Sequence, residues 1–127
     1  MAVAVTNETL VLNTVNPITQ DAATADTANL AEVYTFTPTV FGNRYMILMN
    51  NPTAGEGTVT YSITAGAHWA GVAALTGSVA NEVQSAIVLE TGKYLSAAGT
   101  IIVTFTPATG KKLLTDHAFT AVGVQLP

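Results

Sequence analysis

Apolar and polar residues alternate along much of the chain with a period of two, the spacing of β-strands that bury one face. The clearest run covers residues 58–64, where Thr and Ser alternate with three apolar residues predicted to face inward: Val59, Tyr61 and Ile63. Residues 100–106 repeat the pattern, with apolar side chains at every odd position. Such runs predict strands with a Thr-rich outer face, because the β-branched Thr suits a pleated surface and its hydroxyl stays solvated there.

Other segments extend the set of strands. Residues 33–37 alternate and end at Pro38, which cannot donate to a sheet ladder. Residues 45–49, in the string NRYMILMNNP, are apolar at every position, so this strand is predicted to be central in a sandwich or covered on its second face by a partner. Two further strands are predicted at residues 82–92 and 118–126. The small residues and single Trp of residues 65–77 look least like a strand.

These strands predict the fold class. Six to eight short strands separated by Gly, Pro and Asn turns, without a long helix, indicate an all-β protein. We expect an antiparallel β-sandwich, jelly-roll-like, over residues 33–127. Residues 1–32 lack a clear core pattern and are predicted to form an N-terminal arm and loop. This arm is either extended, with a loosely packed edge strand, or frayed in the free monomer.

The composition narrows the possible partners. Charged residues make up only 9% of the chain, against roughly 25% in typical soluble domains. The surface must therefore be covered by uncharged residues or be partly buried against something else. The formal net charge of -4 offers no electrostatic footprint for phosphate backbones or anionic lipid headgroups. Neither nucleic acid nor a membrane is an expected partner.

Several classes of chemistry lack the residues they need. The chain has no cysteine, which excludes disulfides, thiolate nucleophiles and cysteine-ligated zinc. The first residues, MAVAVTNETLVLNTVN, have no basic n-region, so no secretory signal is expected. No run approaches the ~20 apolar residues of a membrane span. If the protein acts outside a cell, release by lysis or assembly into a particle is the expected route.

The titratable residues do not form a recognisable catalytic set. His68 and His117 are the only histidines, and Asp116 precedes His117 directly. Adjacent residues on a strand point to opposite faces, so this pair is expected to be a polar turn before the last strand rather than a base with its carboxylate. The glycines of AGEG have no following Lys-Ser/Thr, so no phosphate-binding loop is predicted. We expect neither enzyme activity nor a cofactor.

The acidic residues could also form a metal site. Asp21 and Asp26 lie in QDAATAD, which lacks the alternating oxygen ligands and turn glycine of an EF-hand loop. A surface Ca²⁺ held by Asp21, Asp26 or Glu32 stays open as a minor hypothesis, and no metal site is predicted.

What the pattern favours is an interaction protein. Low charge, abundant Thr and Ala, an unanchored arm and one strand apolar on both faces are typical of a subunit completed by its neighbours. His68 beside Trp69 is interpreted as an aromatic anchor at a loop or subunit contact, with a small ligand platform as the alternative. The candidate interface residues are Met46, Leu48, His68, Trp69, Val3, Val5, Leu10 and Leu12.

Read as a whole, the chain resembles small tailed-phage head decoration proteins, also called capsid cement or auxiliary proteins. The likeness spans most of the sequence. It comprises a start of the MAVxxT kind, an Ala/Thr-rich lead-in, the strings RYMILMNNP, GTVTYSITAG, VQSAIVLETGKYLSAAG and GTIIVTFTP, and a last strand ending in Leu-Pro. The resemblance implies a β-sandwich on the exterior of an icosahedral capsid in the virion, as a homotrimer at three-fold or quasi-three-fold positions.

The same resemblance implies a mechanical function. The partner would be the major capsid protein, and the chain would stabilise the shell by bridging neighbouring subunits. The arm would order on binding by adding a strand to a capsid subunit or a neighbouring copy. The alternative is an extracellular carbohydrate-binding or adhesion module in which Trp69, Tyr61 or Tyr94 stack on sugar rings. A hydrolytic enzyme is a third class, and it would need a catalytic group among His68, His117 and the carboxylates.

Overall fold

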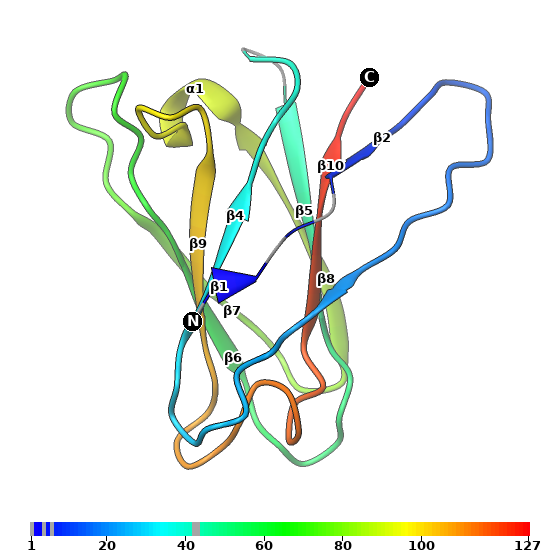
Figure 1. The fold of residues 1–127 in the computed structure, drawn as a ribbon, viewed down its shortest axis with the longest axis vertical. Coiled ribbons are helices and arrows are strands. Elements are labelled where there is room, and N and C mark those ends of the chain that lie inside the picture. Colours follow the sequence, from blue (N-terminus) through cyan, green and yellow to red (C-terminus); the bar gives the residue numbers. More distant parts are fainter. Residues whose placement is uncertain (1, 4, 6, 42–43) are drawn as a thin grey trace.

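Two five-stranded sheets face each other in the computed structural model, which describes residues 2–3, 5, 7–41 and 44–127 (Figure 1). One sheet has the strand order β1 (Ala2–Val3), β4 (Glu32–Phe36), β9 (Ile101–Thr106), β6 (Val59–Ile63) and β7 (Leu75–Val79). The other has the order β2 (Asn7–Thr9), β10 (Thr120–Gln125), β5 (Arg44–Asn51) and β8 (Val83–Glu90), and β3 (Asp21–Ala22) also pairs with β10. A single helical turn, α1 (Thr91–Tyr94), follows β8. The expected all-β sandwich is confirmed.

Alternation of side chains builds the core between the sheets. In β4, β6 and β9 the predicted inward positions are buried or half-buried, and the Thr residues between them mostly face solvent. Aromatic rings fill the centre: Tyr34 meets Phe105 edge to face at 5.0 Å, and Phe105 lies 4.6 Å from Phe119. Such pairs add about 0.5–1.5 kcal/mol beyond the apolar area that they bury.

Strand β7 was not predicted, because it lies at the end of the segment that looked least like a strand. Gly77 occupies its middle, and glycine is usually unfavourable in a strand interior. Here Tyr61 lies directly opposite Gly77 on β6, and a Cβ on residue 77 would come within 2.6 Å of the Tyr61 ring. The missing side chain therefore makes room for a tyrosine, which stabilises a strand that the local sequence disfavours.

The sheets are mixed rather than purely antiparallel, because of the N-terminal segment. β1 runs parallel to β4 in one sheet, and β2 runs parallel to β10 in the other. Parts of the predicted arm, residues 1–32, thus form edge strands of both sheets, and Ala23 and Ala25 are fully buried in the core. The accessible surface of 6320 Å² is close to the ~6,400 Å² expected for a compact monomer of 13.1 kDa. One chain therefore completes its own core.

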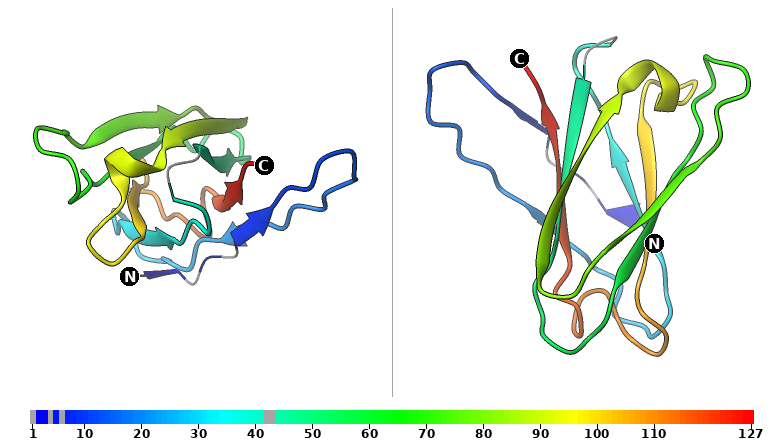
Figure 2. Two further views of the ribbon diagram at one scale, coloured as in Figure 1. Left: turned by 90° about the horizontal axis from the view of Figure 1, so that it is seen from above. Right: turned by 180° about the vertical axis from the view of Figure 1, so that it is seen from behind.

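Loops gather at the two ends of the sandwich, as the two further views show (Figure 2). α1 and the loops that follow β4, β6 and α1 lie together at one end. The turns after β5, β7 and β9 lie at the other end. The loop of residues 10–20, between β2 and β3, projects outward from the β10 edge and rises toward the end that carries α1.

Candidate docking surfaces

The residues predicted as interface candidates fall in three separate places: the outer face of β5, the loop end that carries α1, and the N-terminal segment. Each place is built from different elements.

The first place is the outer face of the sheet that contains β5. Tyr45, Ile47 and Met49 point into the core, whereas Met46 and Leu48 alternate with them and are only partly buried. β5 lies between β10 and β8, so both of its edges are paired, and its outer face carries apolar residues in addition to its core face. Its neighbours continue the apolar surface, because Met46 pairs with Val88 and Leu48 pairs with Ala86 on β8. Val88 is 52% exposed.

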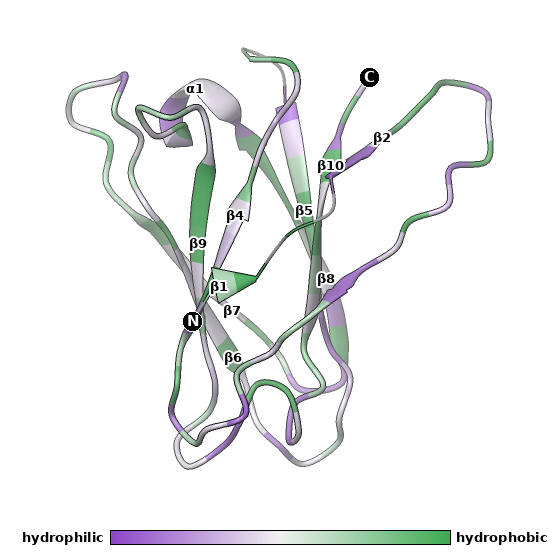
Figure 3. Ribbon diagram, in the orientation of Figure 1, coloured by the Kyte–Doolittle hydropathy of each residue, from purple (hydrophilic) through white to green (hydrophobic). Residues whose placement is uncertain are grey.

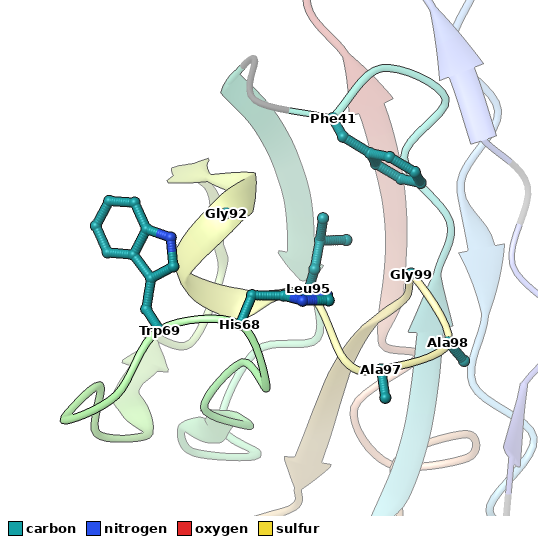
Figure 4. A pocket seen from close by; sticks show the side chains of 8 residues that line it. All are labelled: Phe41, His68, Trp69, Gly92, Leu95, Ala97, Ala98 and Gly99. Atoms are coloured by element: carbon teal, nitrogen blue, oxygen red, sulfur yellow. The ribbon is translucent and has the colours of Figure 1, made fainter.

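The second place is an apolar pocket of about 470 Å³ at the end that carries α1 (Figure 4). This volume falls in the range of sites that bind small ligands or single protruding side chains. The pocket is formed by the loops after β4, β6 and α1. Its lining residues are Phe41, His68, Trp69, Gly92, Leu95, Ala97, Ala98 and Gly99.

Two exposed aromatic rings form the walls of this pocket. Trp69 is 56% exposed and Phe41 is 63% exposed, and they flank Leu95. Each ring lies close to a glycine: a Cβ on Gly99 would come within 3.3 Å of Phe41, and one on Gly92 within 3.8 Å of Trp69. His68 is fixed by a 3.2 Å hydrogen bond between its Nε2 and the carbonyl oxygen of Ser96. Of the described residues that line the pocket, none is charged.

The third place is the projecting loop, residues 10–20. Its apolar side chains face solvent, and Figure 3 shows hydrophobic residues along the loop. Leu12 is 70% exposed and Val15 is 91% exposed; the other exposed apolar residues here are Val11 and Ile18. No residue from 9 to 20 is charged. The loop is therefore an apolar projection, which is unusual for an isolated protein surface.

Hydrogen bonds give the tip of the projecting loop a defined shape. The side chain of Asn16 accepts from the backbone N–H of Val11 at 2.9 Å and donates to the Val11 carbonyl at 3.0 Å. It also donates to the carbonyl of Thr14 at 2.8 Å, and Asn13 takes a left-handed backbone conformation at the turn. At the base, the Leu10 N–H donates to the Gln125 carbonyl of β10. Because Asn16 acts like a strand partner for Val11, the tip is preorganised.

The N-terminal candidates divide between core and surface. Val3 and Val5 are partly buried and pack against the core, and Leu10 is half-buried. Only Leu12 lies on the exposed tip. Sequence reasoning missed Val15 and Phe41. For Val15 a signal exists, because the string LVLNTVNPI combines apolar residues with turn residues, which would have indicated an exposed apolar loop.

Neither histidine is joined to a carboxylate. His117 is fully buried: its Nε2 accepts from the Ala108 N–H at 3.2 Å, so its Nδ1 carries the proton and donates to Asn51 Oδ1 at 3.0 Å. Burial lowers the pKa of His117, an effect larger than the opposing influence of the nearby Glu56 and Asp116 carboxylates. Asp116 instead accepts from the Lys112 N–H at 2.8 Å. His117 thus lies in a turn before β10, as predicted, but it is a buried structural group.

The acidic residues considered for Ca²⁺ are engaged elsewhere. The fully buried carboxylate of Glu32 accepts from the backbone N–H groups of Thr24 and Ala25, at 2.9 and 3.1 Å, and from the Thr24 hydroxyl. Asp26 accepts from the hydroxyl of Thr115. In the described part of the chain, no three His, Cys, Asp or Glu residues gather as metal ligands would. Nor does any helix among those residues have the length and apolarity to cross a membrane.

Comparison of the chain with protein-family models, with curated proteins and with solved structures yields no match.

Proposed function

We propose that the chain is a non-enzymatic structural protein that binds the outer surface of a tailed-phage capsid. It would bridge neighbouring major capsid protein subunits and so stabilise the shell of the virion. The proposal combines the resemblance in sequence with one structural observation. Strands β5 and β8 present the apolar side chains of Met46, Leu48 and Val88 on their outer face, with the charged Arg44 and Glu90 at one end of it, although the inner face of the sheet already fills the core.

That face suits docking on a large protein surface. Exposed apolar side chains gain about 25 cal/mol for each Å² removed from water, and Arg44 and Glu90 lie at one end of the face, where the rim of a contact can leave them solvated. A standard protein–protein contact buries about 1,600 Å². If copies of the chain are linked to each other, the repeated contacts on the shell also strengthen attachment through multivalency. A bound subunit that spans two capsomers thereby opposes their separation.

The first test asks whether the chain is a virion protein. Purified particles of the encoding phage are analysed by quantitative mass spectrometry and cryo-electron microscopy. The proposal expects a copy number that matches three-fold sites and density on the capsid exterior. Particles that lack the chain would overturn the proposal.

The second test asks which surface docks. Val88→Asp places a charge on the exposed part of the outer face, and we expect it to weaken co-sedimentation with expanded capsid shells at least ~10-fold, or about 1.4 kcal/mol. Thr35→Asp is the matched control, because Thr35 is exposed on a strand of the opposite sheet. Equal binding by both variants would show that docking uses another face. Deleting the whole arm is a poorer test, since Val3 and Val5 pack against the core.

A carbohydrate-binding module is the second candidate, and the exposed Trp69 beside the apolar pocket is the observation that favours it. Stacking on sugar rings needs such an aromatic surface. Tyr61 and Tyr94, the other predicted stacking residues, are partly buried and pack against the core. Sugar hydroxyls also need polar partners, and the described lining offers only His68 and Trp69 as polar side chains. A glycan array separates the candidates, because a capsid protein of this kind should bind no glycan there.

A further inference from the structure

We infer that the projecting loop, residues 10–20, of one copy binds in the apolar pocket of a second copy, with Leu12 and Val15 as the inserted side chains. This inference rests on the geometry of the two surfaces and does not depend on the capsid proposal. It assigns an occupant to the pocket and a partner to the loop.

The two surfaces match in chemistry. The loop tip is uncharged and exposes the apolar side chains of Leu12 and Val15 beside polar Asn and Thr residues, and the pocket is apolar with no charged residue in its described lining. Trp is enriched among the residues that dominate the binding energy of protein interfaces, and such residues lie in well-packed, desolvated pockets. The formal net charge of -4 makes two copies repel each other. A contact through two neutral surfaces places no like charges against each other and desolvates none.

The two surfaces also match in form. The loop is convex and its tip is held in shape by Asn16, so little conformational entropy is lost when it binds. The pocket is concave, and the absence of a side chain at Gly92 and Gly99 lets the rings of Trp69 and Phe41 lie close to the backbone. A preorganised projection and a preformed pocket are the combination from which even a small contact gains measurable affinity.

The loop is directed away from the pocket of its own chain. It extends outward from the β10 edge, so that its tip, although at the same end as α1, lies on the side of the sandwich away from α1 and the pocket (Figures 1 and 2). The contact is therefore between copies. Since the two surfaces differ, the contact is heterologous, and repeated use of it produces either a closed ring or an open chain of copies.

Complementing variants test this directly. Leu12→Ser combined with Val15→Ser removes the projection and leaves the pocket intact. Ala98→Phe fills the pocket and leaves the projection intact. By sedimentation velocity between about 1 µM and 1 mM, we expect the wild type to self-associate and each variant alone to associate at least ~10-fold more weakly. An equimolar mixture of the two variants should form a 1:1 heterodimer that grows no further, because only one contact is possible.

Two controls separate docking from folding. All the changed residues are exposed, so far-UV circular dichroism and thermal midpoints should match the wild type. Leu114→Ser removes an exposed apolar side chain from the segment between β9 and β10, which lies at the end opposite α1, and should leave self-association unchanged.

Engineered cysteines give an independent readout, since the natural chain has none. Val15→Cys and Ala98→Cys variants are mixed under mild oxidation, and the mixed disulfide should predominate over both homodisulfides. A wild type that stays monomeric up to about 1 mM, or mixed variants that fail to associate, would overturn the inference. So would a pocket that binds a glycan or an unrelated peptide while the wild type stays monomeric.

Discussion

Gly123, in the middle of β10, is the position where the smallest possible addition should cost the most stability. It lies diagonally across from Tyr45 on the inner side of the sheet. A Cβ on residue 123 would lie 2.7 Å from both the Tyr45 Cζ and the Phe36 Cδ1, and closer still to the Tyr45 hydroxyl oxygen. All three contacts lie below the separation that real Cβ atoms tolerate, and both rings are fully buried. Gly123→Ala therefore cannot be accommodated without moving the Tyr45 ring.

Movement of that ring has a second cost. The Tyr45 hydroxyl donates to Asn7 Oδ1 on β2, and burial raises the pKa of Tyr45 above its ordinary value, so the hydroxyl stays protonated. We expect overpacking to cost about 1–3 kcal/mol and the lost hydrogen bond a further 1–2 kcal/mol or so. Gly123→Ala should thus lower the free energy of unfolding by about 2–5 kcal/mol, and Tyr45→Phe by about 1–2 kcal/mol.

A double-mutant cycle separates this explanation from simple loss of packing. In the Tyr45→Phe background, Gly123→Ala meets no hydroxyl and has no hydrogen bond left to break. The double variant should therefore be more stable than the sum of the two single effects predicts, by at least about 1 kcal/mol. Urea unfolding followed by far-UV circular dichroism measures all four proteins, because the exposed Trp69 makes fluorescence a weak probe. Effects that add to within ~0.5 kcal/mol would refute the proposed geometry.

Two further predictions concern buried polar groups. Because burial lowers the pKa of His117 in the folded protein, the folded state binds fewer protons than the unfolded state, and stability should fall as pH drops below about 6.5. In urea unfolding measured from neutral to acidic pH, His117→Gln should reduce the fall of the midpoint with falling pH. His68→Gln, which changes an exposed histidine, is the control. An unchanged pH dependence in His117→Gln would contradict the assignment of this effect to His117. Glu32→Ala leaves the N–H groups of Thr24 and Ala25 without an acceptor and should destabilise by about 2–4 kcal/mol. Glu32→Gln retains one acceptor oxygen and should cost less in the same unfolding assay, so equal losses would count against this account.

The strands with regular alternation were predictable from the sequence because their faces are set locally. β4, β6 and β9 each bury one side and expose Thr on the other, and a period of two is visible without knowledge of the partner strand. β7 escaped prediction because Gly77 depends on Tyr61, a residue of another strand. The pairing of β2 and β3 with β10 was not predicted either, because it also depends on a distant part of the chain: about a hundred residues separate the partners.

The surfaces were predictable only in part. Trp69 and Leu12 were recognised as candidates and are exposed, whereas Val3 and Val5 were recognised and pack against the core. An apolar residue in an irregular segment gives no local signal of which way it points. The pocket joins Phe41 to residues more than 25 positions away, so only the folded chain reveals it.

The position of β10 imposes an order on synthesis. β10 lies between β5 on one side and β2 and β3 on the other, yet among the strands it is the last to leave the ribosome. At about 5–20 residues per second, β5 waits roughly 4–15 s for the strand that completes its ladder. During that interval β2 and β3 lack the strand with which they pair. The backbone N–H and C=O groups on the β10 side of β5 are also unpaired and can pair with other nascent chains. The order of synthesis thus exposes an unpaired strand edge until the last strand of the chain has been made.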